Sequence, residues 1–236
     1  MITVEEHLAS VLAPVSALAP VRAPLATAHG CRLAEELHAR LAVPPFDNSA
    51  MDGYAVRAAD VAAATPDSPV GLRVTVDLAA GTGRRHHLVP GTAARIMTGA
   101  PVPPGADAVV PVEQTDQPPG DAPLPETVRV YRAPTTGAHL RRAGEDVRAG
   151  DELLPAGTVL GSVQLSAAAS VGHGDLLVHP RPRVGVLSTG DELVPAGQEL
   201  AHGQIPDSNS PMLAALVREA GGEPVQLGSV GDDPAE

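Results

Sequence analysis

The sequence contains no lysine, no tryptophan and a single cysteine, Cys31. One cysteine excludes an internal disulfide framework and a cysteine-based zinc site, so we expect Cys31 to be buried and structural. Aromatic residues make up 1% of the chain and hydrophobic residues 43%, so the core must be packed with Ala, Val and Leu. No hydrophobic run approaches the ~18 residues of a membrane span, and the N-terminus lacks the features of a secretory signal, which predicts a cytoplasmic protein without membrane contact.

Positive charge is also scarce. The 16 basic residues, all Arg, stand against 28 acidic ones, which gives a net charge of −12. This balance argues against nucleic-acid binding, because nucleic acids require a basic face. The 24 Gly and 25 Pro are dispersed among hydrophobic runs, which favours a turn-rich β structure over a disordered linker. A chain of 236 residues has room for one large or two modest domains.

Local patterns predict the elements of the first half of the chain. Residues 4–12 carry apolar side chains at helical spacing with two Glu in the first turn, and a second helix is predicted over residues 33–40. From residue 46 to 138, short apolar runs alternate with turn residues, which is typical of a compact all-β module. Its polar, Pro-rich residues 115–125 are predicted to form a mobile hairpin loop. Two of its strands are predicted at residues 108–112 and 127–131.

Two Ala-Gly turn units follow, at residues 147–151 and 154–158. Each has an apolar stretch beside it, so the two are predicted to form a hairpin with one another. Gly161 then precedes a short apolar stretch that ends before Gly172, which predicts a helix over residues 162–169.

The last part of the chain reads as a β-α-β unit. The continuous apolar run at residues 184–187 is typical of a buried parallel strand, and Pro224 begins a second strand that ends at residue 230. Asp207 to Ser210 supply caps for a helix over residues 211–220. Ligands of such sheets bind beyond the C-terminal strand ends, where residues 188–192 and 231–233 lie. Two strands and one helix do not complete such a domain, so we expect it to be truncated.

Three polar segments before residue 150 are candidates for chemistry. Residues 46–57 set Asp, Asn and Ser among apolar anchors, which is either an ordinary polar turn or a positioned site. Thr98 and Gly99 end a strand, where a hydroxyl and backbone N–H groups could meet an anion. Arg141 and Arg142 form either a surface salt bridge or a bidentate oxyanion contact.

A fourth candidate lies at the C-terminal ends of the two parallel strands. Acidic residues beside hydroxyls and Gly, at residues 188–192 and at Asp232 and Asp233, fit Mg²⁺ bound together with a substrate phosphate. The alternative is that one residue of each acidic pair caps a following helix. We expect Asp233 to be a cap, and Glu192 and Asp232 to be ligands.

Taken together, these segments resemble the molybdopterin molybdotransferases, the family of MoeA and the gephyrin E-domain. The resemblance rests on long motifs in the family's order: FDNSAMDGYAVR (46–57), RIMTGAPVPPGADAVVPVEQT (95–115), RRAGEDVRAGDELLPAGTVL (141–160), RPRVGVLSTGDELVPAG (181–197), DSN (207–209) and GDDP (231–234). It implies a mixed α and β fold: an elongated multi-domain chain with a β module inserted in a small mixed domain, followed by an incomplete three-layer α/β molybdopterin-binding domain. The implied parts are an N-terminal helix packing on the α/β domain (1–25), a small mixed domain (26–45 and 138–178), the inserted β module (46–137) and the α/β domain (179–236).

The resemblance implies the last step of molybdenum cofactor assembly. Molybdate is inserted into adenylylated molybdopterin with help from Mg²⁺, and AMP leaves. It also implies a homodimer whose active site is shared between subunits, with molybdopterin adenylyltransferase as the upstream partner.

Site residues are carried over by motif position. Asp52, Thr98, Glu192 and Asp232 would be catalytic, and Glu192 and Asp232 would also hold Mg²⁺. Asp52 and Thr98 would reach across from the partner subunit to orient molybdate or the dithiolene end. The substrate-binding residues would be Arg141, Asp146, Ser188, Thr189 and Gly190. Arg141 would neutralise an oxyanion, and Asp146 would orient it or shape its loop.

The sequence also departs from the family pattern. It lacks the Gly-Gly-Val-Ser and Pro-Gly-Lys-Pro segments and the C-terminal β domain that the resemblance implies, so we expect these 236 residues to have little or no activity alone. A non-catalytic scaffold of the gephyrin type is the alternative function. A nucleotide or sugar-phosphate hydrolase sharing the α/β domain is a third, and the matches between residues 46 and 160 argue against it.

Overall fold

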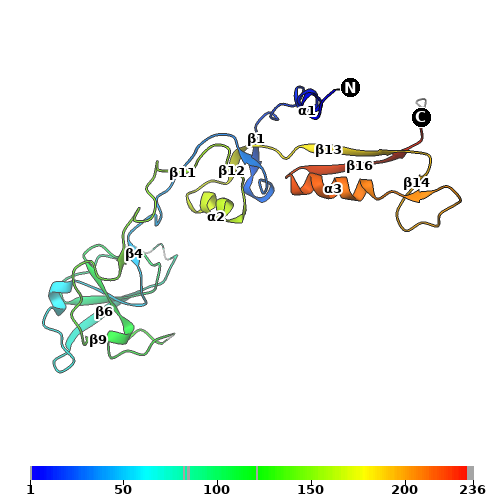
Figure 1. Cartoon of the computed structure of the whole chain (residues 1–236). Coiled ribbons are helices and arrows are strands. Elements are labelled where there is room, and N and C mark those ends of the chain that lie inside the picture. The colour runs from blue at the N-terminus through cyan, green and yellow to red at the C-terminus, as the bar shows by residue number, and fades with distance from the viewer. Residues whose placement is uncertain (1, 82, 84–85, 121, 233–236) are drawn as a thin grey trace. The chain divides into compact units, whose positions relative to one another are not determined.

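The computed structural model describes residues 2–81, 83, 86–120 and 122–232 (Figure 1). Its internal contacts divide the chain into two compact units. The β unit is His38–Asp151, and the flanking unit is Met1–Leu37 together with Glu152–Glu236. The predicted mixed α and β fold is confirmed, with strands predominating and three α-helices among the described residues. The predicted four-part domain division stays a prediction; its β module falls inside the β unit.

The β unit is built on a five-stranded sheet with the strand order β8-β5-β7-β6-β9. Its strands are β5 (Gly53–Val56), β6 (Val70–Leu78), β7 (Thr92–Ile96), β8 (Ala108–Pro111) and β9 (Thr127–Val130). Neighbours run antiparallel except β6 and β7, which are parallel. The strands predicted at 108–112 and 127–131 are β8 and β9, each one residue shorter than predicted.

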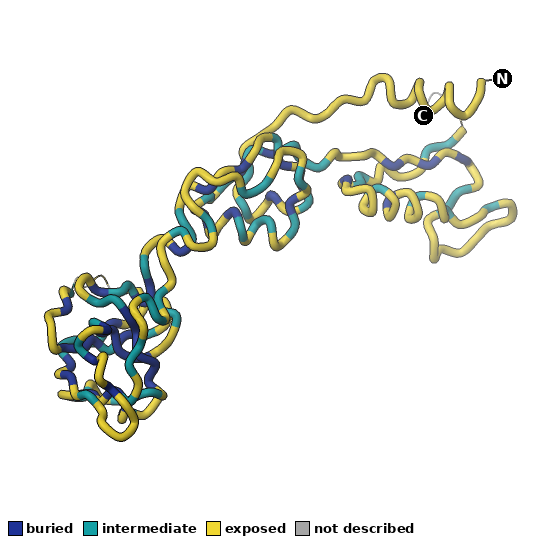
Figure 2. Tube along the Cα trace, turned by 60° about the vertical axis from the view of Figure 1, so that its left-hand side comes forward, coloured by how far each residue is buried: buried dark blue, intermediate teal, exposed yellow. Residues whose placement is uncertain are grey.

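Both faces of this sheet are buried. Along β5, Tyr54 and Val56 join one core cluster while Ala55 joins another, because successive side chains of a strand point to opposite faces. Figure 2 shows many buried residues in this unit. The clusters consist mainly of Ala, Val and Leu, as predicted, and Tyr54 is the one aromatic residue among the buried residues described.

Short elements surround the sheet. β4 (Asn48–Ser49) pairs antiparallel with β10 (Leu140–Arg141). Two 3-10 helices, η2 (Ala58–Val61) and η3 (Val112–Gln114), follow β5 and β8 in the chain. Two further short strands lie at the boundaries between the units in sequence: β3 (Leu37–His38) spans the first boundary, and β11 (Glu152–Leu154) begins at the second.

The flanking unit contains a three-stranded antiparallel sheet. Its order is β1 (Val21–Pro24), β12 (Asp175–His179) and β2 (Arg32–Leu33), with the 3-10 helix η1 (Leu25–Thr27) after β1. The predicted helix at 162–169 is confirmed as α2 (Ser162–Ser170). The flanking unit has a hydrophobic core cluster that includes Leu33, Leu160 and Val178. Cys31 is buried in this cluster, as expected.

The helix predicted over residues 33–40 is wrong, and so is the hairpin between the two Ala-Gly turn units. Leu33 and Leu37 have helical spacing, but the chain here is extended and bonds to distant backbone. The Leu33 N–H donates to Thr158 O at 2.9 Å, and the Ala39 N–H donates to Asp151 O at 2.8 Å. The two turn units therefore pair with residues 33–40 and not with each other, because hydrogen bonds between segments far apart in sequence determine the pairing.

Helix α1 (Val4–Leu12) and the β-α-β unit agree closely with the sequence patterns. The helix begins at a capping box in which the Thr3 and Glu6 side chains each accept from the other's backbone N–H. The predicted β-α-β unit is confirmed: β13 (Arg183–Thr189) runs parallel to β16 (Glu223–Val230), with α3 (Asn209–Glu219) between them in sequence. A second parallel pair joins β14 (Leu193–Val194) to β15 (Ile205–Pro206). No helix in the described part of the chain has the length and apolar character needed to cross a membrane.

Candidate functional site

Three motif segments that are far apart in sequence lie together in the β unit. The Ser49 N–H donates to Ala100 O at 3.1 Å, and the Gly99 N–H donates back to Ser49 O at 2.8 Å. The Ala50 N–H donates to His139 O at 2.9 Å, beside the pairing of β4 with β10. The first three candidate segments of the sequence therefore form one polar surface.

Asp52 and Thr98 are joined directly on this surface. One oxygen of Asp52, Oδ1, accepts from the Thr98 backbone N–H and from the Thr98 hydroxyl, both at 2.7 Å. The backbone N–H contributes most to lowering the pKa of Asp52 below its ordinary value, and the hydroxyl adds to the effect. Both residues are exposed, so Asp52 presents an oriented, ionised carboxylate to a ligand.

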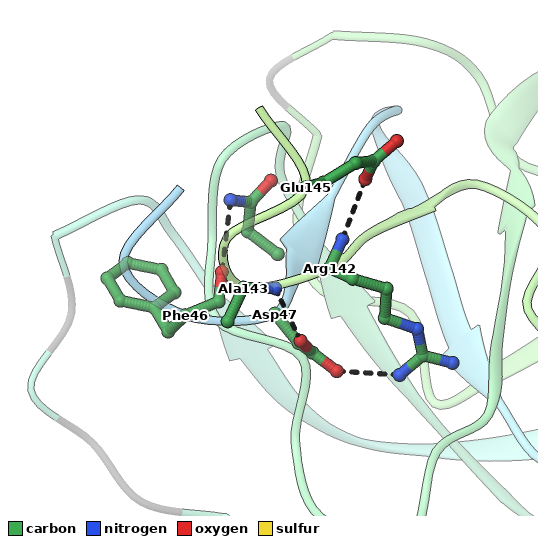
Figure 3. A network of polar contacts seen from close by, with 6 residues as sticks. Phe46, Asp47, Arg142, Ala143 and Glu145 are labelled. Atoms are coloured by element: carbon green, nitrogen blue, oxygen red, sulfur yellow. Dashed lines mark hydrogen bonds and ion pairs between the residues drawn. The ribbon is translucent and has the colours of Figure 1, made fainter. Parts of the chain in front are cut away.

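Arg141 and Arg142 are each paired with a carboxylate (Figure 3 shows the Arg142 network). Arg141 Nη2 lies 2.5 Å from Asp146 Oδ2. Arg142 Nη1 lies 2.6 Å from Asp47, which also accepts from the Ala143 N–H at 2.8 Å. Both guanidinium groups are therefore engaged in ion pairs at the surface.

A cavity of about 320 Å³ lies in the β unit beside Asp52. One wall is formed by the sheet and η3, and the other by the Pro-rich segment after η3. The residues lining it are Asp52, Gly53, Tyr54, Asp77, Ala79, Arg95, Met97, Val112, Gln117, Pro118, Gly120, Ala122, Pro123 and Pro125. The segment predicted as a mobile loop thus forms a wall of this cavity.

In the flanking unit, Ser188 is held in a hydroxyl and carboxylate network at the end of β13. Its hydroxyl donates to Asp207 Oδ2 at 3.0 Å and lies 2.6 Å from the Ser210 hydroxyl. Asp207 Oδ1 also accepts from the N–H groups of Asn209 and Ser210 at the start of α3. The Ser210 hydroxyl and N–H lower the pKa of Asp207 most. Sequence reasoning treated Asp207 only as a helix cap; its position in the DSN motif was the available signal for a second role.

The other predicted residues of the strand ends are positioned by the backbone. Thr189 is the last residue of β13, and the Gly190 N–H donates to Val230 O at 3.1 Å. The Asp232 N–H donates to Asp191 Oδ1 at 3.2 Å, which ties the two acidic segments together. Asp233, predicted to be a cap, lies outside the described residues. Among those described, no group of three or more His, Cys, Asp or Glu side chains could hold a metal ion.

The stability of the β unit should fall in acid. The pKa values of Asp47 and Asp77 are lowered, like that of Asp52. Hydrogen bonds from the Ala143 N–H, and then from Arg142, lower the pKa of Asp47, and the hydrogen bond from Arg95 lowers that of Asp77. Each group binds protons more weakly when folded, so its contribution is present above the unfolded pKa near 4 and is lost as pH falls through the folded value. After allowance for solvent screening, we expect a loss of about 1–2 kcal/mol between pH 7 and pH 3.

Urea unfolding across that pH range measures this loss. Asp47→Asn should flatten the dependence, whereas the control Asp67→Asn, at an exposed turn residue, should leave it unchanged. Equal slopes for all three proteins would contradict the assignment.

Known proteins are similar to this chain along its length. Residues 2–172 match the family model "MoeA N-terminal region (domain I and II)", and residues 185–236 match "Probable molybdopterin binding domain". Over its whole length the chain is 48% identical to molybdopterin molybdenumtransferase 2 and 40% identical to molybdopterin molybdenumtransferase 1, both of Mycobacterium tuberculosis. It covers 57% and 58% of those two proteins, so it spans less than two thirds of their length.

A solved structure is similar as well. The crystal structure of the molybdopterin biosynthesis MoeA protein from Pyrococcus horikoshii OT3 superposes on the whole chain with a TM-score of 0.79 and 31% sequence identity, and 61% of that protein is covered. These matches define the class as proteins of molybdenum cofactor biosynthesis. Within that class, the chain belongs to the MoeA family, which confirms the resemblance found in its motifs.

Proposed function

We propose that this chain carries part of the machinery that inserts molybdate into adenylylated molybdopterin with release of AMP. The observation that carries the proposal is the convergence of the segments around Ser49, Thr98 and Arg141 on one surface. Those segments hold the motifs shared with the molybdenumtransferases, and they offer an ionised carboxylate next to a guanidinium-bearing loop. A second set of motif residues, Ser188 to Glu192 with Asp232, lies at the edge of a parallel strand pair, where α/β proteins bind ligands.

Mg²⁺ belongs to the same proposal. Glu192 and Asp232 would hold it, and it would supply charge neutralisation on the substrate's pyrophosphate. Mg²⁺ in proteins usually takes one or two carboxylates and completes its shell with water and substrate phosphate. Two carboxylates at a strand edge, without a larger acidic cluster among the described residues, therefore fit a metal that arrives with substrate.

Assembly and location complete the proposal. The family resemblance supports a homodimer with a shared active site, supplied by molybdopterin adenylyltransferase, in the cytoplasm. Asp52 and Thr98 would contribute to the site from one subunit, and Ser188 to Gly190 would contact the substrate from the other.

A chimera tests the activity. This chain would replace the matching 57% of the 48%-identical M. tuberculosis relative, so that the rest of that protein is present. We expect AMP release from adenylylated molybdopterin that depends on both molybdate and Mg²⁺, at a rate comparable to the relative's own. Residues 1–236 alone, assayed in parallel, should release little or no AMP.

The controls separate an enzyme from a scaffold. The relative itself reports whether the assay works, and circular dichroism reports whether the chimera is folded. A folded chimera that binds adenylylated molybdopterin but never releases AMP would contradict the proposal and favour the non-catalytic, gephyrin-like alternative.

A further inference from the structure

The cavity beside Asp52 has an unusual balance of charge. Arg95 is the one cation among the described lining residues, and it faces Asp77: Nε donates to Asp77 Oδ1 at 3.0 Å and Nη2 pairs with Oδ2. Its remaining Nη1 donates to Ala122 O at 2.5 Å, across the cavity on the Pro-rich wall. The Arg95 side chain is only 14% exposed, so this guanidinium is committed to the protein.

Asp52 therefore sets the net charge of the described lining residues. With Arg95 neutralised by Asp77, those residues carry one uncompensated negative charge, that of Asp52. A carboxylate repels molybdate, phosphate and a dithiolene, so the cavity disfavours each anionic part of the proposed substrate. What remains of that substrate is its uncharged rings, the pterin and the adenine, and of these the pterin offers two adjacent N–H donors on one edge.

The acceptor capacity of Asp52 matches such a ring. A carboxylate has about four lone-pair sites, and Thr98 occupies two of them on Oδ1. Oδ2 has no hydrogen-bond partner among the described residues, so it is available to an incoming N–H donor. The 2-amino-4-oxo pyrimidine edge of a pterin presents an amino group and a ring N–H side by side, which are donors that a carboxylate recognises.

The cavity walls are suited to the flat faces of a ring. Pro118 and Pro123 line one side, and Met97 and Val112 line the sheet side. The volume of about 320 Å³ is at the lower end of the ~300–1,000 Å³ range of small-molecule sites. Apolar walls with one oriented polar group are the usual composition of a site that selects a neutral heterocycle.

We propose that this cavity binds the pterin ring of the substrate, with its 2-amino edge directed to Asp52. The inference rests on the proposed function, because the pterin is part of molybdopterin. It assigns Asp52 and Thr98 to the opposite end of the substrate from the molybdate or dithiolene end that the family resemblance implied.

Matched ligands test the inference on residues 1–236. Pterin and lumazine differ in that lumazine has a carbonyl oxygen where pterin has the 2-amino group. By isothermal titration calorimetry we expect pterin to bind about tenfold or more tightly than lumazine, because a charge-assisted hydrogen bond is lost. Asp52→Asn should weaken pterin binding by about tenfold or more and leave lumazine binding unchanged.

A pair of neighbouring substitutions tests the cavity itself. Ala79 lines the cavity and Ala80, also exposed, does not. Ala79→Leu should weaken pterin binding by filling the space, and Ala80→Leu should not. No detectable pterin binding, or equal binding of pterin and lumazine, would each overturn the inference.

The outcomes are separable from those of the proposed function. If the chimera releases AMP while residues 1–236 fail to discriminate pterin from lumazine, the pterin assignment falls and the activity stands. If pterin is selected but the folded chimera releases no AMP, the cavity assignment stands and the activity falls.

Discussion

Gly53→Ala should destabilise the β unit by about 3 kcal/mol or more, although it adds one methyl group. Gly53 opens β5, where it pairs with Pro111 of β8. A β-carbon on Gly53 would overlap the carbonyl oxygen of Val110 and lie 2.9 Å from its carbon and 3.0 Å from the Pro111 Cα. These are backbone atoms in the centre of a buried sheet, so β5 and β8 would have to separate.

The same sheet supplies a matched control. Gly71 lies in β6, and a β-carbon there would meet no atom within 4 Å. Gly71→Ala should change the free energy of unfolding by about 0.5 kcal/mol or less. Urea unfolding of both variants measures the contrast, and similar midpoints for the two would show that the strand spacing at Gly53 can relax.

Gly53 also illustrates what sequence alone can and cannot predict. Asp52-Gly53 reads as a polar turn, since both residues favour turns. The structure shows that the glycine is needed because another strand approaches closely, and that strand lies more than 50 residues later in the chain. Helix α1, by contrast, is predicted with its bounds, because the apolar stripe and the two Glu of its first turn are all local.

The same distinction applies to the site. Asp52, Thr98 and Arg141 were found from motifs, but their convergence depends on the pairing of β4 with β10 and on the Ser49–Ala100 contact, which no local pattern encodes. The Asp47–Arg142 pair joins residues 95 positions apart, so its role could only be read from the structure. The helix prediction for residues 33–40 is wrong for the same reason. Leu33 and Leu37 have helical spacing, but they reach the core from an extended chain.

Glu192→Ala and Asp232→Ala should each lower AMP release by the chimera about 100-fold or more, because both carboxylates are proposed to hold Mg²⁺ on the substrate's pyrophosphate. Their positions are defined by contacts between the strand ends: Gly190 bonds to Val230, and the Asp232 N–H bonds to Asp191. The loss should be accompanied by weaker apparent Mg²⁺ affinity in a titration of the rate. A general loss of folding would instead appear in the circular dichroism spectrum.

Two further substitutions give this prediction its contrast. Glu199→Ala removes an exposed carboxylate from the loop after β14 and should leave the rate and the Mg²⁺ dependence unchanged. Asp191→Ala removes the acceptor of the Asp232 N–H without removing a proposed ligand. Its rate of AMP release should therefore lie between those of the two ligand variants and that of Glu199→Ala. If all four variants released AMP at the unsubstituted rate, the carboxylates would be helix caps and strand-end ties, and the α/β part of the chain would be a binding scaffold.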